Sequence, residues 1–210
     1  MDIFATLLDL ALHLDVHLGG LIRDHGAWVY AILFAIIFAE TGLVVAPFLP
    51  GDSLLFVAGT LAALGGLNIH VLVASLIAAA ILGNTVNYTI GRFVGMKLFT
   101  DRGSRWLNPE YLERTHAFYE RHGGIAVVIS RFIPIIRTYV PFVAGLGTMT
   151  YPRFTLYNAV GATLWVGSLC YAGHFFGNVT WVKEHLTLII IGIVLVSLIP
   201  VAVALVRSRS

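Results

Sequence analysis

Three stretches of the chain are apolar for the length that a membrane-spanning helix requires, about 20 residues. They are residues 71–90, 154–176 and 186–206, and none of them contains a Lys, Arg, Asp or Glu. This pattern predicts three transmembrane helices, the last of them near the C-terminus.

Two further apolar stretches, residues 27–66 and 124–147, are interrupted by residues that break helices. The interruptions are Pro47, Pro50 and Gly51 in the first stretch, and Pro134, Pro141, Gly145 and Gly147 in the second. Proline removes a backbone donor and breaks a helix. Broken backbone at membrane depth requires burial within protein or a lined cavity. We therefore expect two broken, re-entrant hairpins rather than two further membrane spans.

The N-terminal segment, residues 1–24, has a different pattern. Asp9, His13 and His17 line one face of a helix, and leucines line the opposite face. This arrangement predicts an amphipathic helix that lies at the membrane interface. The segment lacks a positively charged first region, so it is not typical of a cleavable signal.

Positive residues predict the orientation in the membrane. Between residues 92 and 121 there are six Lys or Arg against four Asp or Glu, and two arginines follow the last predicted span. Positive residues are enriched in cytoplasmic loops. We therefore expect residues 96–122 to form a cytoplasmic loop or interfacial helix, and the C-terminus to be cytoplasmic as well.

Short sequences recur in the two halves of the chain, residues 26–95 and 123–177. The recurring pairs are Ile90–Gly95 with Ala172–Gly177, and Val57–Gly59 with Val143–Gly145. Each half reads as an interfacial helix, a broken hairpin and a transmembrane helix, and counting spans back from the C-terminus gives the halves opposite orientations. Inverted repeats with discontinuous helices are typical of transporters, whose site lies near the bilayer midplane. The predicted fold class is an all-α integral membrane protein.

The composition excludes several other classes of protein. Hydrophobic residues make up 58% of the 210 residues and charged residues only 11%, and the mean hydropathy is +0.88. A soluble domain has about 25% charged residues, so an ordinary soluble protein, a disordered chain and a coiled coil are excluded. The net charge of +2 and the lack of a basic stripe argue against nucleic acid as a partner.

Three motifs give the chain a resemblance to a known family. They are Glu40–Gly42 with Pro47–Ser53, Ser130–Gly145 with its two arginines and two prolines, and Gly83–Tyr88 with Gly91–Arg92. From Gly26 to Gly177 the chain resembles the DedA family of bacterial inner-membrane proteins, which is related to the eukaryotic VTT-domain lipid scramblases. The resemblance implies two re-entrant hairpins and an inner-membrane location. Family members are implicated in undecaprenyl phosphate recycling, proton-linked envelope maintenance and lipid scrambling, and others in drug resistance or oxyanion uptake.

The resemblance also implies which residues are functional. By position, the family's essential acidic pair falls on Glu40 and Asp52. Its essential arginines fall on Arg131 and Arg137. Many members carry an acid where this chain has Asn84, which argues against a proton role for that position here.

The energetic cost of buried charge supports a function for these four residues. A charge at the bilayer centre costs about 2.5–3.5 kcal/mol on insertion scales. The alternative is a buried salt-bridge network that only holds the hairpins together. Arginine suits a phosphate group because its planar guanidinium binds two oxygens at once, so we expect Arg131 and Arg137 to converge on a phosphate headgroup. Either Glu40 or Asp52 is expected to carry a proton.

Several other residues complete the expected site. Those that could line it are Asn84, Asn87, Tyr88, Pro50, Gly51, Pro134 and Pro141. We interpret Trp165 as a packing residue and Asn158 as a hydrogen-bond partner between helices. Because Cys170 is the one cysteine and no nucleophile is paired with a base, we expect no catalytic residue and no enzymatic activity. A metal site on His13 and His17 is less favoured than a hydrated face, so we expect no metal and no cofactor.

The sequence therefore predicts a proton-linked transporter or flippase for an anionic lipid phosphate. The favoured substrate is undecaprenyl phosphate, recycled for envelope maintenance, and the alternative is a proton-coupled transporter of small solutes, drugs or oxyanions. The expected partners are an anionic polyprenyl lipid or phospholipid, protons and the bilayer. The sequence gives no oligomeric state.

Overall fold

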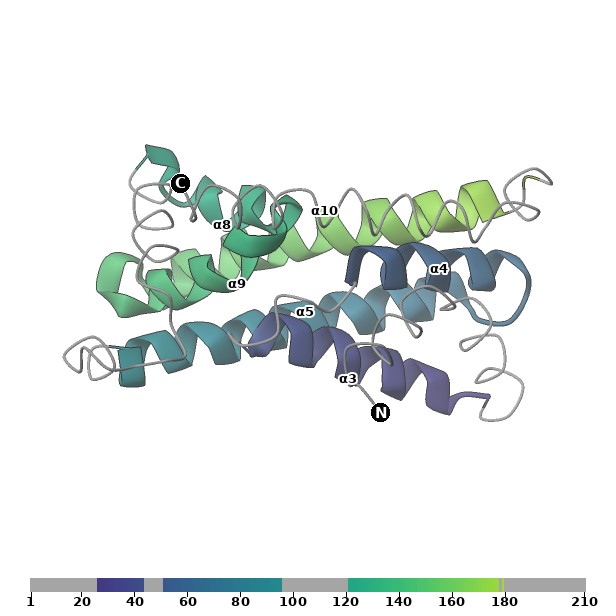
Figure 1. Ribbon diagram of the computed structural model, residues 1–210, viewed down its shortest axis with the longest axis horizontal. Helices are drawn as coiled ribbons and strands as arrows, with labels where there is room; N and C mark the ends of the chain where they lie inside the picture. The colour runs from purple at the N-terminus through teal and green to yellow at the C-terminus, as the bar shows by residue number, and fades with distance from the viewer. Residues whose placement is uncertain (1–25, 44–50, 96–120, 178, 180–210) are drawn as a thin grey trace, which may run out of the picture. The chain divides into compact units, whose positions relative to one another are not determined.

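A computed structural model describes residues 26–43, 51–95, 121–177 and 179 of the chain. All regular structure among these residues is helical (Figure 1), which confirms the predicted all-α class. Three predicted segments lie outside the described residues: the interfacial helix (1–24), almost all of the cytoplasmic segment (96–122) and the C-terminal span (186–206). The cytoplasmic location of the C-terminus therefore stays a prediction.

The first predicted hairpin contains two short helices. They are α3 (Trp28–Gly42, 15 residues) and α4 (Gly51–Ala63, 13 residues). At about 1.5 Å per residue, neither helix reaches the thickness of a hydrocarbon core, which is about 30 Å. Each helix is therefore too short to cross a bilayer alone.

Two long helices coincide with predicted spans. The first is α5 (Ile69–Ile90), which continues through the wider π-helical turn η1 (Gly91–Gly95). Within it, Ile69–Phe93 is the one helix in the described part of the chain that is both long and apolar enough to cross a membrane. The second is α10 (Tyr151–Gly177), which has 27 residues and is less apolar than α5.

The second predicted hairpin is broken at one point. Its elements are α8 (Ile125–Ile129), the 3-10 turn η2 (Ser130–Phe132), α9 (Pro134–Val143) and the π-helical turn η3 (Ala144–Thr148). Ile133 is extended, with φ −120° and ψ 103°, because the residue before a proline is pushed out of the helical region. Pro134 then begins α9, whereas Pro141 lies inside it without ending it. The break therefore lies at Pro134, and the helix widens after Pro141.

The chain divides into two compact units. Among described residues, unit 1 contains 26–34, 51–76, 166–177 and 179, and unit 2 contains 35–43, 77–95 and 121–165. Each of the helices α3, α5 and α10 has one part in unit 1 and the other part in unit 2.

In unit 1, helices α4 and α10 touch through their backbones. A side chain on Gly59 would overlap the carbonyl of Cys170, and one on Gly173 would overlap the carbonyl of Phe56. The hydroxyl of Thr60 also donates a hydrogen bond to the Gly173 carbonyl over 3.1 Å. Such close approach of two helices requires glycine at the contact.

Unit 2 contains the same kind of contact. There the end of α5 together with η1 touches the end of α9 together with η3. Here Gly145 faces the carbonyl of Tyr88, and Gly91 faces the carbonyl of Phe142. In both units, the carbonyl that one glycine faces belongs to the residue three positions before the other glycine. The recurring sequences therefore make one equivalent contact in each unit, which we call the glycine crossing. The opposite orientation of the two halves stays a prediction.

Candidate functional site

Buried polar side chains are concentrated in unit 2. Eleven polar or charged residues are buried among those described, and only Ser53 and Thr60 belong to unit 1. The other nine are Glu40, Thr41, Asn84, Asn87, Ser130, Arg131, Arg137, Thr138 and Asn158. Because burying polar groups is costly unless they are satisfied or used, unit 2 contains the candidate site.

The first arginine of the site is paired with a carboxylate. Arg137 lies in the first turn of α9, where its amide bonds to the Ile133 carbonyl over 3.0 Å. Its Nη2 donates to Oε1 of Glu40, which comes from the last turn of α3. The two side chains are 7% and 0% exposed. The break at Ile133 thus starts a helix that delivers Arg137 to a buried ion pair.

The second arginine has neutral partners. Arg131 lies in η2 and is 2% exposed. Its Nη2 donates to Oδ1 of Asn158 over 2.6 Å and to the Ala80 carbonyl over 3.2 Å. Among the residues that the structure describes, no carboxylate forms an ion pair with it. The two arginines therefore differ in how their charge is balanced.

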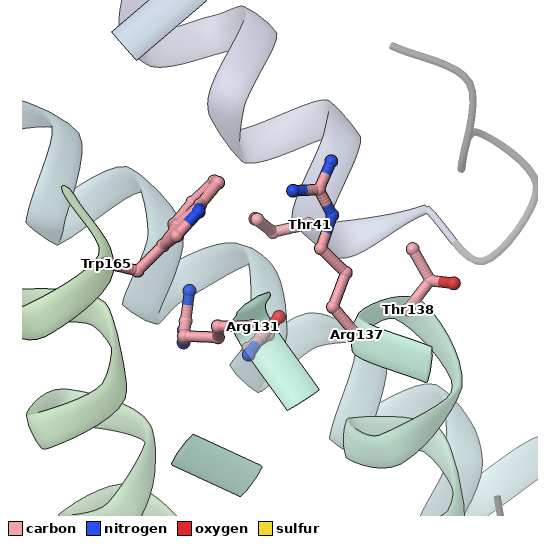
Figure 2. Close-up of a pocket in the computed structure, with 6 residues that line it drawn as sticks. Thr41, Arg131, Arg137, Thr138 and Trp165 are labelled. Atoms are coloured by element: carbon pink, nitrogen blue, oxygen red, sulfur yellow. The ribbon is translucent and has the colours of Figure 1, made fainter. Parts of the chain in front are cut away.

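Trp165 of α10 lies beside both arginines (Figure 2). The guanidinium carbons of Arg131 and Arg137 are 5.8 and 5.3 Å from the centroid of its ring. Cations within about 6 Å of an indole face are stabilised by the ring quadrupole. Both guanidinium groups thus lie beside one ring, and Trp165 is a shared surface for them rather than a packing residue alone. Their convergence on a phosphate group stays a prediction.

Asparagine side chains connect the helices around the arginines. Oδ1 of Asn158 also accepts a hydrogen bond from Nδ2 of Asn84 over 3.1 Å. Nδ2 of Asn87 donates to the carbonyls of Thr41 and Thr138 over 3.3 and 2.8 Å. These bonds link α5 to α3, α9 and α10, which fixes the elements that deliver the charged groups.

The site encloses very little space. The cavity is lined by Thr41, Asn84, Arg131, Arg137, Thr138 and Trp165, and its volume is about 10 Å³. That is close to the minimum for one water molecule, about 10–15 Å³. A phosphate group does not fit, so this conformation of the site is closed.

Other expected site residues do not line this cavity. Tyr88 is in the hydrophobic core of unit 2, where it stacks on Phe154 with centroids 4.4 Å apart and donates to the Met149 carbonyl over 2.8 Å. Asp52 lies in the first turn of α4, in unit 1, after Gly51. Pro50 lies outside the described residues.

Four residues of the site were not expected there or were assigned a lesser role. They are Thr41, Thr138, Asn158 and Trp165. One signal was available in the sequence, because Asn158, Gly161 and Trp165 are spaced i, i+3 and i+7 and share one helix face. The two threonines carry no such signal, because their backbone carbonyls bind Asn87, which is distant from both in the sequence.

Comparisons with known proteins give one family and several relatives. Residues 49–175 match the VTT domain. Protein DedA of Escherichia coli (strain K12) is 53% identical over 211 residues, which cover 100% of this chain and 96% of that protein. An uncharacterized membrane protein of Mycobacterium leprae (strain TN) is 45% identical over 169 residues, with 80% and 76% covered. Inner membrane protein YghB of Escherichia coli (strain K12) is 36% identical over 157 residues, with 75% and 72% covered. No solved structure matches the chain.

Proposed function

The chain belongs to the DedA family of VTT-domain membrane proteins, and from this premise we propose that it carries an anionic lipid phosphate across the bacterial inner membrane. The substrate we propose is undecaprenyl phosphate, recycled for envelope maintenance in a proton-linked cycle. The observation that carries the proposal is Arg131, a buried cation whose described hydrogen-bond partners are neutral. The relative YghB is named an inner membrane protein, which supports the inner-membrane location.

The charge balance of the site favours an anion. Two arginines and one glutamate are buried together in unit 2, which leaves one positive charge in excess among the buried residues described there. An isolated charge in a low-dielectric interior is costly. A phosphate monoester supplies the missing negative charge, and its oxygens match the forked guanidinium geometry.

The ion pair suggests how a proton enters the cycle. A phosphate that binds Arg137 competes with Glu40 for the same guanidinium. A buried carboxylate separated from its cation is destabilising, and uptake of a proton by Glu40 removes that cost. Phosphate binding and protonation of Glu40 are therefore coupled in the proposal.

The closed cavity requires a second conformation. A space of about 10 Å³ cannot admit a phosphate group. We propose that the site opens to receive the headgroup while the polyprenyl tail stays in the bilayer. Transport by alternating access has this requirement, because the site must close between its two open states.

The inverted repeat belongs to the same proposal, and the matching glycine crossings support it. Leu64 follows α4 and is 51% exposed, and Arg121 is exposed before α8. We expect a cysteine at Leu64 to react with a membrane-impermeant thiol reagent from outside the cell. A cysteine at Arg121 should react only from the cytoplasmic side. Labelling of both from one side contradicts the inverted repeat.

The direct test of function is lipid binding by the purified protein in nanodiscs. Undecaprenyl phosphate is compared with undecaprenol, which has the same tail without the phosphate. We expect binding of the phosphate lipid only. Equal binding of both lipids contradicts the role of the phosphate.

Inorganic phosphate separates the lipid from the alternative substrate class. The excess positive charge of the site suits a free oxyanion as well, which is the observation that favours a small-solute transporter. We expect inorganic phosphate to compete only weakly with undecaprenyl phosphate. Inorganic phosphate that binds as tightly as the lipid supports the oxyanion transporter instead.

Proton coupling is tested in proteoliposomes. We expect the rate of lipid translocation to depend on pH in the wild type, and Glu40→Gln or Asp52→Asn protein that stays monodisperse to lose this dependence. An unchanged pH response in both variants contradicts proton coupling through these acids.

A further inference from the structure

One face of α10 surrounds the Arg131 side chain. Asn158 binds its Nη2 over 2.6 Å, and Trp165 lies 5.8 Å from its guanidinium carbon. Between them, Gly161 leaves room for the side chain, since a Cβ there would lie 3.1 Å from Cδ and 3.2 Å from Nε of Arg131. We call Asn158, Gly161 and Trp165 the α10 cradle.

The amide of Asn158 has a defined orientation. Its Nδ2 donates to the Ile81 carbonyl over 3.0 Å, and a carbonyl can only accept. Its Oδ1 therefore faces the other two partners, Asn84 and Arg131, both of which donate to it. Asn158 is fully buried and all three of its hydrogen bonds are to neighbouring segments of unit 2.

A neutral oxygen at this place has a chemical consequence. Aspartate would accept the same bond from Arg131, and it would also cancel the charge, as Glu40 does for Arg137. An amide oxygen fixes the guanidinium without cancelling its charge. Nε of Arg131 has no hydrogen-bond partner among the described residues, so the guanidinium retains a donor for an incoming group.

We propose that Asn158 is a positioning residue that holds Arg131 through a neutral oxygen, so that the charge of this arginine is reserved for a phosphate monoester. The inference rests on the proposed function and divides the work of the two arginines. Arg131 anchors the anion, whereas Arg137 exchanges between the anion and Glu40. The rest of the cradle sets the place of the Arg131 guanidinium.

The test compares Asn158→Asp with Asn158→Leu in nanodiscs, with undecaprenyl phosphate as the probe. Both variants lose the hydrogen bond to Ile81, and the aspartate also places an acceptor-only carboxylate oxygen against that carbonyl. The aspartate gives Arg131 a carboxylate and should lower affinity at least about tenfold, because close charge pairs couple strongly. The leucine leaves the charge of Arg131 uncancelled and should lower affinity less.

Stability should follow the opposite order. Asn158→Asp keeps two acceptor bonds and adds an ion pair, so it should unfold at a higher temperature than Asn158→Leu. A merely structural Asn158 predicts that binding and stability fall together, with the leucine variant worse in both. That result overturns the inference, and so does Asn158→Asp protein that binds like the wild type.

A second substitution moves Arg131 without changing any charge. Gly161→Ala places a Cβ 3.1 Å from Cδ of Arg131 and 3.2 Å from Cα of Val128, so these neighbours must shift by a few tenths of an ångström. The shift of Arg131 should weaken binding of undecaprenyl phosphate severalfold. Gly167→Ala on the same helix is the control, because nothing lies within 4 Å of a Cβ there. Equal affinities of these two variants contradict the positioning role.

The failure of the inference differs from the failure of the proposed function. Wild-type protein that binds neither undecaprenyl phosphate nor inorganic phosphate overturns both. Wild-type protein that binds only inorganic phosphate overturns the lipid substrate, and the Asn158 variants are then compared with inorganic phosphate as the probe. Wild-type protein that binds the lipid, together with unaffected Asn158→Asp protein, overturns only the role of Asn158.

Discussion

Units 1 and 2 are built around the same glycine crossing and differ in what they bury beside it. In unit 1 the crossing joins Gly59 and Gly173, and in unit 2 it joins Gly145 and Gly91. Unit 2 then buries two arginines and a glutamate, whereas the buried polar side chains described in unit 1 are hydroxyls. The crossing is thus a scaffold that the sequence uses twice, and it does not determine the chemistry placed next to it.

The largest effect on stability is expected from the buried charges that unit 2 has and the described part of unit 1 lacks. Glu40→Gln removes the carboxylate that pairs with Arg137, and breaking a buried pair costs about 3–5 kcal/mol. Replacing both partners by leucine should recover most of that stability. Ser53→Ala, at a buried hydroxyl of unit 1, should cost much less. Chemical unfolding in detergent measures all three, and a Glu40→Gln protein as stable as Ser53→Ala contradicts the contrast between the units.

The shared crossing predicts an equal effect in both units. Gly59→Ala and Gly145→Ala each place a methyl group against a backbone carbonyl, and such overpacking costs about 1–3 kcal/mol. Gly167→Ala is the control, because a Cβ there meets nothing within 4 Å. Thermal unfolding should show similar losses for the first two variants. A large loss for only one of them shows that the crossings are not equivalent.

Lysine in place of either arginine tests the chemistry of unit 2 while the positive charge is kept. Arg131→Lys and Arg137→Lys keep a cation but lose the two-oxygen fork, so each should weaken binding of undecaprenyl phosphate about tenfold. Binding in nanodiscs, on monodisperse protein, is the measurement. If both variants keep wild-type affinity, the arginines only hold the hairpins together.

The smallest effect is expected in unit 1. Thr60→Val removes the hydrogen bond to the Gly173 carbonyl and should cost about 0.5–1.5 kcal/mol of stability. Binding of undecaprenyl phosphate should stay at the wild-type level, because Arg131 and Arg137 both lie in unit 2. Reduced affinity in a stable Thr60→Val protein contradicts the assignment of binding to unit 2 alone.

The parts of the fold that follow from local chemistry were predictable from the sequence. Pro134 breaks the second hairpin because it forces the preceding Ile133 into an extended conformation. Pro141 was expected to interrupt the same hairpin and does not. The helix continues past it and widens into the π-helical turn η3, and such local adjustments accommodate proline in membrane helices.

The partners within the site were not predictable in this way. Rare charges in apolar sequence identified Arg131 and Arg137, but nothing local shows that only Arg137 pairs with Glu40, 97 residues away. The same holds for Asn158 and Trp165, whose contacts with the arginines form only in the folded unit 2. Sequence reasoning finds groups that are costly to bury, and tertiary packing decides how each is balanced.

The position of Trp165 gives the protein an optical reporter of its own site. Indole emission responds to charges near the ring, and two guanidinium carbons lie 5.3 and 5.8 Å from its centroid. Any anion that draws one of them away changes that field. Replacing Trp28, Trp106 and Trp181 by phenylalanine leaves Trp165 as the single tryptophan, which can be excited at wavelengths that tyrosine does not absorb. Opening of the site can then be followed in real time without an attached dye.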